Sequence, residues 1–280
     1  GKVITLTQVE RTGDNAILKE ATDLRNDKPL SGESSFNSKG EGVAYVSPQH
    51  RESINNIIAH YVNGLKSDSN LFRILAYTNA AVAKYNQQVR HLLGYDTVIP
   101  QAGEPMTGYI NWGYDWKTGK YRLINSESYK VVKTDKPKTL TKRISDGRVI
   151  TIEAVPVTLE DSMGKVDTFD FIDVKTNPLN KQAAETLAYE KKELWAKWGV
   201  TPGKKAKTDI LDEINGINGL LFINDDIIVE ENGKKHYLQK KAIDFGYAMT
   251  VHKSQGSTFT NVLVDDVNIS RAAFNKNNNN

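Results

Sequence analysis

Apolar residues recur every three or four positions in several early stretches of the chain, which is the spacing of one face of an α-helix. Asp14 or Asn15 can cap the first helix, Ser47-Pro48 can open the second, and Gly94 can end the third. The apolar stripes are Ile17, Leu18, Ala21 and Leu24; Ile54, Ile57, Ile58, Tyr61, Val62 and Leu65; and Val82, Tyr85, Val89, Leu92 and Leu93. We therefore expect a helix at each stripe, with the polar residues 26–42 forming an exposed loop.

Short, nearly continuous apolar runs predict buried parallel strands. Residues 72–76 form such a run and lead directly into the third helix at Thr78-Asn79. Near the other end of the chain, residues 247–259 pass from small and apolar residues into a polar loop that contains glycine, and residues 262–264 are apolar again. A strand, a polar loop and a return strand present backbone N–H groups to an anionic ligand at the carboxyl end of a sheet. This pattern predicts a binding site at residues 247–259.

The middle of the chain has a different texture from about residue 108 onward. Apolar and polar residues alternate, which is typical of β-hairpins, and Asn232-Gly233 is a strong signal for a two-residue hairpin turn. We expect a charged helix over residues 180–198, and a strand and turn over residues 220–226. The region is rich in aromatic residues, namely Tyr109, Trp112, Tyr114, Trp116, Tyr121 and Tyr129. Such side chains can stack on bases, but they more commonly form the core and rim of a small barrel.

Composition narrows the class of protein only slightly. The 280 residues include 37 basic and 34 acidic residues, so a formal net charge of +3 gives no broad basic field, and any nucleic-acid contact must be local. The chain has no cysteine, which excludes disulfides and thiolate zinc sites. It also lacks an apolar run near the ~20 residues that span a bilayer. We expect a cytoplasmic protein, with no membrane partner and no metal site of its own.

The run Thr250-Val-His-Lys-Ser-Gln-Gly-Ser-Thr-Phe259 resembles motif V of superfamily 1 helicases. The similarity is greatest to the RecD-like and phage Dda-like branch, in which Thr-x-His-x-x-Gln-Gly is the usual core. The resemblance implies that Thr250, His252 and Lys253 contact single-stranded DNA and that Gln255, Gly256 and Ser257 lie on the nucleotide side. The alternative is a strand and turn with a chance Gln-Gly pair, because a motif needs its structural context.

Two earlier segments agree with this resemblance. Thr78-Asn79 begins a Thr-Asn-x-x-Val-x-x-x-Asn pattern, in which the first pair approaches the DNA backbone and the later Asn86 supports the fold. On its own, Thr-Asn at a helix start is an ordinary cap. Arg11 follows an expected short strand and matches the arginine that reaches the γ-phosphate of ATP, a role suited to a fixed, planar cation. The alternative for Arg11 is a solvated side chain beside Glu10.

The resemblance implies an α/β fold: a RecA-like, P-loop-type parallel-sheet domain that lacks its own phosphate loop and is interrupted by an SH3-like β-barrel insertion. Residues 1–107 would begin the second RecA-like domain, residues 108–240 would form the insertion, and residues 241–280 would complete the domain up to motif VI. The chain begins with Gly1 and ends in an asparagine run, so we expect both ends to be cut from a longer protein. Residues 266–280, which include an Asn268-Ile-Ser270 glycosylation pattern of little weight, are expected to form a loop.

The function implied is that of the C-terminal portion of an ATP-dependent DNA helicase, a monomer that moves 5′ to 3′ on single-stranded DNA and unwinds forked or duplex DNA. Its partners could include replication, repair or recombination proteins. ATP and Mg²⁺ would be held mainly by a first RecA-like domain, so the chain alone should neither hydrolyse ATP nor unwind DNA. The alternatives are a non-catalytic single-stranded DNA-binding or adaptor module derived from a helicase, and a structural α/β protein without a nucleic-acid role.

Overall fold

The computed structural model describes residues 16–47, 51–65, 68, 71–115 and 119–271, which divide into a unit ending at Ile57 and a unit beginning at Ile58. The first unit contains α1 (Ala16–Arg25), as the apolar stripe predicted. The expected exposed loop contains a short antiparallel hairpin, β1 (Ser35–Phe36) and β2 (Gly42–Val43). The Asn37 side chain forms its turn by accepting hydrogen bonds from the backbone N–H groups of Lys39 and Glu41.

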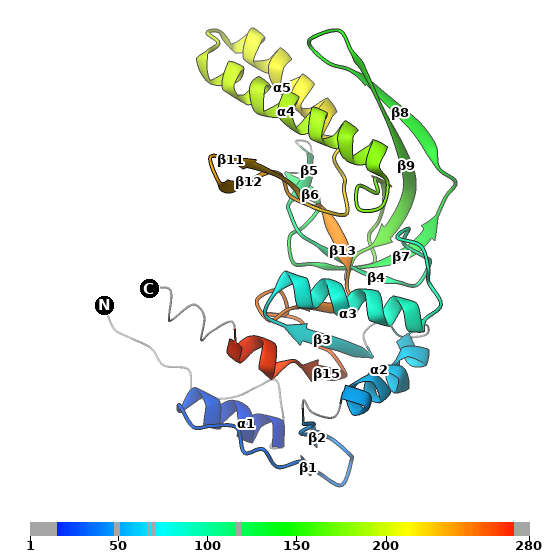
Figure 1. Cartoon of the computed structure of the whole chain (residues 1–280), viewed down its shortest axis with the longest axis vertical. Coiled ribbons are helices and arrows are strands. Elements are labelled where there is room, and N and C mark those ends of the chain that lie inside the picture. The colour runs from blue at the N-terminus through cyan, green and yellow to red at the C-terminus, as the bar shows by residue number, and fades with distance from the viewer. Residues whose placement is uncertain (1–15, 48–50, 66–67, 69–70, 116–118, 272–280) are drawn as a thin grey trace. The chain divides into compact units, whose positions relative to one another are not determined.

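A three-stranded parallel sheet lies at the centre of one part of the second unit (Figure 1). Its strand order is β14 (Ala248–Thr250), β3 (Phe72–Ala76) and β15 (Asn261–Val264), so the strand predicted at residues 72–76 occupies the middle position. The return strand predicted after the polar loop is β15. Both outer strands are parallel to β3, with Thr250 opposite Ala76 and Asn261 opposite Phe72. The carboxyl ends of β3 and β14 therefore meet at one edge of the sheet.

Two of the predicted helices pack near this sheet. α2 (Arg51–Leu65) buries Ile58, Val62 and Leu65, the C-terminal part of its apolar stripe. α3 (Asn79–Leu92) lies across the sheet (Figure 1) and buries Val82 and Val89. It begins at the Thr78 cap, and the chain leaves it through Gly94 at φ 80°, a conformation that glycine adopts without strain.

The middle of the chain forms a curled antiparallel sheet that resembles half of a barrel. The strand order is β10, β9, β7, β4 and β13, and β8 pairs with β9 outside this path. β9 curls the sheet because its first half pairs with β8, whereas its second half pairs with β10 and β7. The strands are β4 (Pro105–Gly108), β7 (Ser128–Thr134), β8 (Lys138–Arg143), β9 (Val149–Glu160), β10 (Val166–Phe171) and β13 (Ile243–Phe245).

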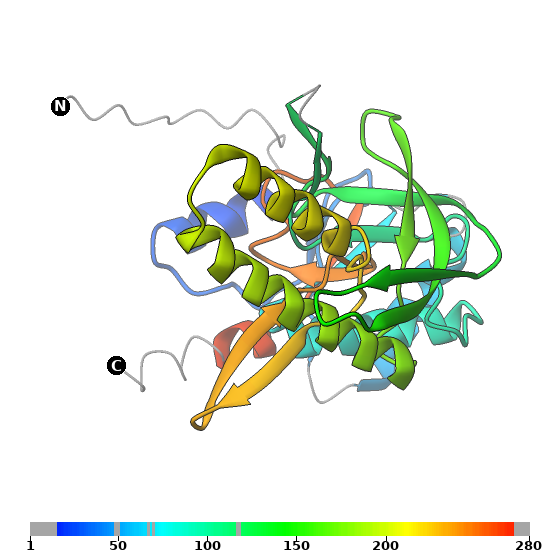
Figure 2. The same ribbon diagram turned by 90° about the horizontal axis from the view of Figure 1, so that it is seen from above.

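A pair of helices and two hairpins complete this part of the chain. The charged helix expected at residues 180–198 is α4 (Pro178–Val200), which packs beside α5 (Lys204–Asn218) (Figure 2). The predicted Asn232-Gly233 turn joins β11 (Ile227–Glu231) to β12 (Lys234–Gln239), with both turn residues at positive φ. A second hairpin consists of β5 (Trp112–Asp115) and β6 (Lys120–Leu123).

The prediction of a strand over residues 220–226 is wrong. This segment makes only an isolated bridge between Ile223 and Ile172, because its carbonyl groups bond to two separate segments. The Phe222 carbonyl accepts from the backbone N–H of Ile172, and the Ile223 carbonyl accepts from that of Ala242. The apolar run is nevertheless buried, with Phe222 in one apolar core and its neighbours in the other. Burial, not pairing in a ladder, explains its composition.

The aromatic residues of this region occupy both the core and the rim. Trp112 makes edge contacts with Phe169 and Phe222, with ring centroids 5.7 and 5.2 Å apart. Tyr114 and Tyr121 face each other across the β5–β6 hairpin and are 40% and 41% exposed. No helix in the described part of the chain is long and apolar enough to cross a membrane.

Candidate nucleic-acid interface

The carboxyl edge of the parallel sheet brings together two segments that the sequence linked only by resemblance. Thr78 and Asn79 follow β3, whereas Thr250 and His252 lie at the end of β14. The backbone N–H of Val251 donates to the Ala76 carbonyl at 3.0 Å, which continues the strand pairing into the loop. One residue further along each segment, the rings of Tyr77 and His252 meet edge to face, with centroids 5.7 Å apart. The site therefore has two walls in contact: the start of α3 and the loop that follows β14.

The wall contributed by α3 is well ordered by hydrogen bonds. The Thr78 hydroxyl accepts from the backbone N–H of Ala81 at 3.2 Å, so Thr78 is a helix cap, as one of the two interpretations expected. The Asn79 side chain is exposed on the first turn of α3. Asn79 is thus the member of the pair whose side chain faces solvent, where a ligand can reach it.

The second wall is a loop, residues 251–260, that begins as a tight helical turn. The backbone N–H groups of Lys253 and Ser254 both donate to the Thr250 carbonyl, and the Ser257 N–H donates to the Ser254 carbonyl. Gly256 then adopts φ 88°, where a side chain would be strained. The candidate nucleotide-side residues lie at the end of this turn: Gln255 and Gly256 are exposed, and Ser257 is half-buried.

Lys253 points toward the antiparallel sheet, although the resemblance assigns it to DNA. Its ammonium donates to the Gly108 carbonyl at 3.0 Å and to the Asn125 side chain at 2.7 Å, and lies 4.2 Å from the centre of the Tyr109 ring. Burial, followed by the nearby charges of Lys241 and Lys240, lowers its pKa to about 8. A phosphate contact by Lys253 would require the side chain to leave these partners.

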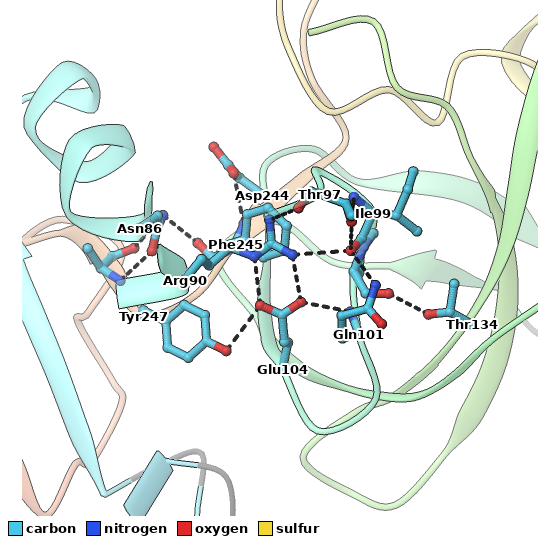
Figure 3. A network of polar contacts seen from close by, with 12 residues as sticks. Asn86, Arg90, Thr97, Ile99, Gln101, Glu104, Thr134, Asp244, Phe245 and Tyr247 are labelled. Carbon is cyan, nitrogen blue, oxygen red and sulfur yellow. Dashed lines mark hydrogen bonds and ion pairs between the residues drawn. The ribbon is translucent and has the colours of Figure 1, made fainter. Parts of the chain in front are cut away.

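A buried amide holds the strand that leads into the loop (Figure 3). Asn86, on α3, is only 2% exposed. Its side-chain oxygen accepts from the backbone N–H of Ala248 at 2.7 Å, and its amide donates to the Phe245 carbonyl at 2.8 Å. Asn86 therefore fixes the chain where β13 passes into β14, in agreement with the fold-supporting role that the resemblance implies.

A buried ion pair lies beside this amide (Figure 3). Arg90 of α3 donates to both carboxylate oxygens of Glu104, at 2.8 and 3.1 Å, and also to the carbonyls of Thr97 and Ile99. Its guanidinium lies 3.8 Å from the centre of the Phe245 ring. A bidentate pair with further hydrogen bonds to carbonyl oxygens is the arrangement that makes a buried ion pair tolerable.

The same carboxylate reaches the strand of the candidate site. The Tyr247 hydroxyl donates to Glu104 at 3.1 Å, and the backbone N–H of Gln101 donates to it at 2.7 Å. Burial and the Glu104 charge raise the pKa of Tyr247 well above its ordinary value, so the hydroxyl remains a donor. Glu104 thus connects α3, β4 and the residue that immediately precedes β14.

Several of these residues had no clear signal in the sequence. Arg90 and Glu104 are a charged pair separated by 14 positions, which no local pattern connects. Asn268 was expected in a loop, but residues 266–271 form a helical turn, and its side chain reaches the end of β3. The Thr-Asn-x-x-Val-x-x-x-Asn pattern was the one available indication of Asn86.

The remaining expectations concern the phosphate and metal chemistry. Arg11 lies outside the described residues. Across the described ranges there is no group of three or more His, Cys, Asp or Glu side chains that could hold a metal ion. A scan against protein-family models gives no match, and a search of curated proteins gives none either.

Proposed function

We propose that this chain is a portion of an ATP-dependent DNA helicase of superfamily 1, related to the RecD-like and phage Dda-like branch. It would supply the second RecA-like domain, with the curled antiparallel sheet as its SH3-like insertion. One observation carries the proposal: the Thr-Asn segment and the motif V segment, 171 positions apart from Asn79 to Thr250, end at the same edge of one parallel sheet. Each of the two motif matches is weak alone, and their proximity in the structure supports the proposal.

In this proposal, single-stranded DNA lies along the carboxyl edge of the sheet. Asn79 and His252 are exposed and make the most direct contacts, while Thr78 and Thr250 shape the two walls, and Lys253 joins them on exchange of its present partners. Donors from helix starts and short polar side chains are suited to a phosphate backbone. A ring pair such as Tyr77 and His252 offers a face for a base.

ATP and Mg²⁺ would bind between this domain and a first RecA-like domain that carries the phosphate loop. Gln255, Gly256 and Ser257 would face the nucleotide, and Arg11 would stabilise charge on the γ-phosphate during transfer. Closure on ATP and opening after hydrolysis would move the DNA-binding edge relative to the other domain. Translocation 5′ to 3′, a monomeric state and a location in the bacterial or phage-infected host cytoplasm follow from the resemblance.

Fluorescence anisotropy with a labelled oligothymidylate tests the DNA-binding half of this proposal. His252→Ala and Asn79→Ala should each weaken binding at least about fivefold, equivalent to about 1 kcal/mol. His60→Ala is the matched control, because His60 is also exposed and also makes an edge contact with a tyrosine, Tyr61, at 5.1 Å. Equal loss in all three variants, or no binding by the wild-type chain, would contradict the proposal.

An ATPase assay tests the assignment of the chain to one half of the motor. The 280 residues alone should give no DNA-stimulated hydrolysis. Turnover by the purified chain would show that it holds a complete nucleotide site, whereas DNA binding that never depends on a partner domain or ATP would favour the non-catalytic module.

A further inference from the structure

The side chain of Asn268 lies across the junction between β3 and α3. Its oxygen accepts hydrogen bonds from two consecutive backbone N–H groups, those of Tyr77 at 2.8 Å and Thr78 at 3.0 Å. Its amide nitrogen lies 3.3 Å from the Thr78 hydroxyl, to which it donates. A single amide is therefore hydrogen-bonded to the backbone N–H and the hydroxyl of Thr78 and to the backbone N–H of Tyr77.

Asn268 is itself held by the residues around it. Asp265 follows β15, and its carboxylate accepts from the backbone N–H of Asn268 at 3.0 Å and from the Tyr85 hydroxyl at 2.9 Å. The backbone N–H of Asp265 donates to the Leu75 carbonyl at 2.8 Å, which extends the β15–β3 pairing. The helical turn at residues 266–271 is therefore fixed to both β3 and α3.

The consequence of this contact extends to both walls of the candidate interface. The hydrogen bond to the Tyr77 N–H holds the backbone from which the Tyr77 ring projects, and that ring packs against His252 at a centroid distance of 5.7 Å. Fixing Thr78 fixes the cap on which the position of Asn79 depends. Asn268, contributed by a third segment, is thus bonded to the two residues that adjoin these exposed side chains: Tyr77, which contacts His252, and Thr78, which precedes Asn79.

We propose that Asn268 is a positioning residue of the nucleic-acid interface, which holds the Tyr77–Thr78 junction and, through the Tyr77 ring, His252 in the geometry that binds single-stranded DNA. The inference rests on the proposed function, because it assigns a role within that interface. In this role Asn268 does not need to contact DNA itself.

The chain offers a matched control at the opposite end of the same strands. Asn261 is half-buried like Asn268, and its side chain also ties the β15 segment to β3, by donating to the Leu71 carbonyl at 3.0 Å. Its oxygen accepts from the Tyr61 hydroxyl at 3.4 Å. Because Asn261 lies opposite Phe72, at the amino end of β3, its loss should affect stability without moving His252.

The test combines NMR of the histidine ring with DNA binding by the full chain. The chain has 5 histidines, so the Hε1 resonance of His252 can be assigned by its absence in His252→Ala. Asn268→Ala should move this resonance toward its position in Tyr77→Leu, and should weaken oligothymidylate binding at least about fivefold. Asn261→Ala should change neither. Asn268→Asp keeps the accepting oxygen, and should restore the resonance.

The outcomes separate the inference from the proposed function. If the wild-type chain binds DNA and Asn268→Ala binds equally well, or if Asn261→Ala weakens binding as much, Asn268 has no positioning role. An unmoved His252 resonance in Asn268→Ala overturns the inference even where affinity falls. If the wild-type chain binds no oligonucleotide, the proposed function fails whatever the NMR result, and the DNA role of Asn268 fails with it.

Discussion

The ammonium of Lys253 lies 2.7 Å from the side-chain oxygen of Asn125, although the two residues are 128 positions apart in the chain. Its other acceptors, the Gly108 carbonyl and the Ser126 hydroxyl, are also neutral oxygens of the antiparallel region. The Lys253 ammonium, which donates to neutral oxygens, therefore connects the loop that carries the helicase-like motif to the curled sheet. A partly buried contact of this kind should be worth more than an exposed ion pair.

A double-mutant cycle measures the free energy of the Lys253–Asn125 interaction. Lys253→Met and Asn125→Ala, alone and together, should give a coupling free energy of about 1 kcal/mol in urea unfolding, since hydrogen bonds to charged groups are stronger than neutral ones. The exposed pair Lys133 and Asp135, whose charged atoms lie 3.0 Å apart, provides the comparison. Its cycle should give about 0.5 kcal/mol or less. A larger value for the exposed pair would refute the ranking.

Replacing Glu104 by glutamine should be among the most destabilising changes in the chain. The Glu104 side chain is fully buried against Arg90, and loss of its charge leaves the guanidinium buried without a counter-charge. We expect a loss of about 3 kcal/mol in the free energy of unfolding. Asp170→Asn, which breaks the partly exposed Lys138–Asp170 pair, should cost about 1 kcal/mol or less. Similar losses in the two variants would show that burial of the first pair has no special cost.

The pH dependence of stability should reveal the lowered pKa of Lys191. Burial lowers its pKa to about 8 in the folded chain, against about 10.4 for a free lysine. Between these values the unfolded chain holds a proton that the folded chain has released, so the contribution of Lys191 to stability increases as the pH rises. The stability of the wild type relative to Lys191→Met should therefore rise by about 1 to 2 kcal/mol between about pH 7.5 and pH 9.5.

The neighbouring Lys192 supplies the control for this measurement. Its ammonium is exposed and lies 3.5 Å from Glu231, so Lys192→Met removes the same charge from a solvated position. The difference between wild type and Lys192→Met should change little over the same range. A flat difference for Lys191→Met as well would contradict the proposed effect of burial.

Two glycines with open surroundings should respond in opposite directions to alanine. Gly233 has φ 70° in the β11–β12 turn, and a Cβ there would meet no described atom within 4 Å. The cost of Gly233→Ala is therefore backbone strain alone, about 1 kcal/mol. Gly199 lies in α4 with equally open space and without a positive φ, so Gly199→Ala should stabilise by about 0.5 kcal/mol. Thermal unfolding of both variants tests the contrast.

Local patterns in the sequence predicted most of the elements but not the contacts that join them. The apolar run of β3, the stripe of α3 and the Asn232-Gly233 turn were correctly predicted because each depends on residues close in sequence. The strand expected at residues 220–226 failed, since burial of an apolar run does not by itself require a ladder of hydrogen bonds.

The candidate site shows the same division. The small and apolar residues before the polar loop predicted the end of a strand there, and β14, whose last residue is Thr250, confirms it. The direction of Lys253 depends on Asn125 and Gly108, and the position of Tyr77 depends on Asn268, residues whose distance in the chain leaves no periodic signal. The assignment of the site to DNA and ATP stays a prediction.

The central place of β3 has a consequence for how the chain folds. β3 ends at residue 76, yet both of its neighbours lie beyond residue 247, so the parallel sheet closes only after a very long loop has been joined. The antiparallel strands between them pair mostly with near neighbours along the chain. During synthesis on the ribosome, strands β4 and β7 to β10 of the curled sheet can therefore pair first, while β3 has no neighbouring strand until β14 and β15 emerge. Mutations that slow the closing of the curled sheet should expose β3 to aggregation for longer.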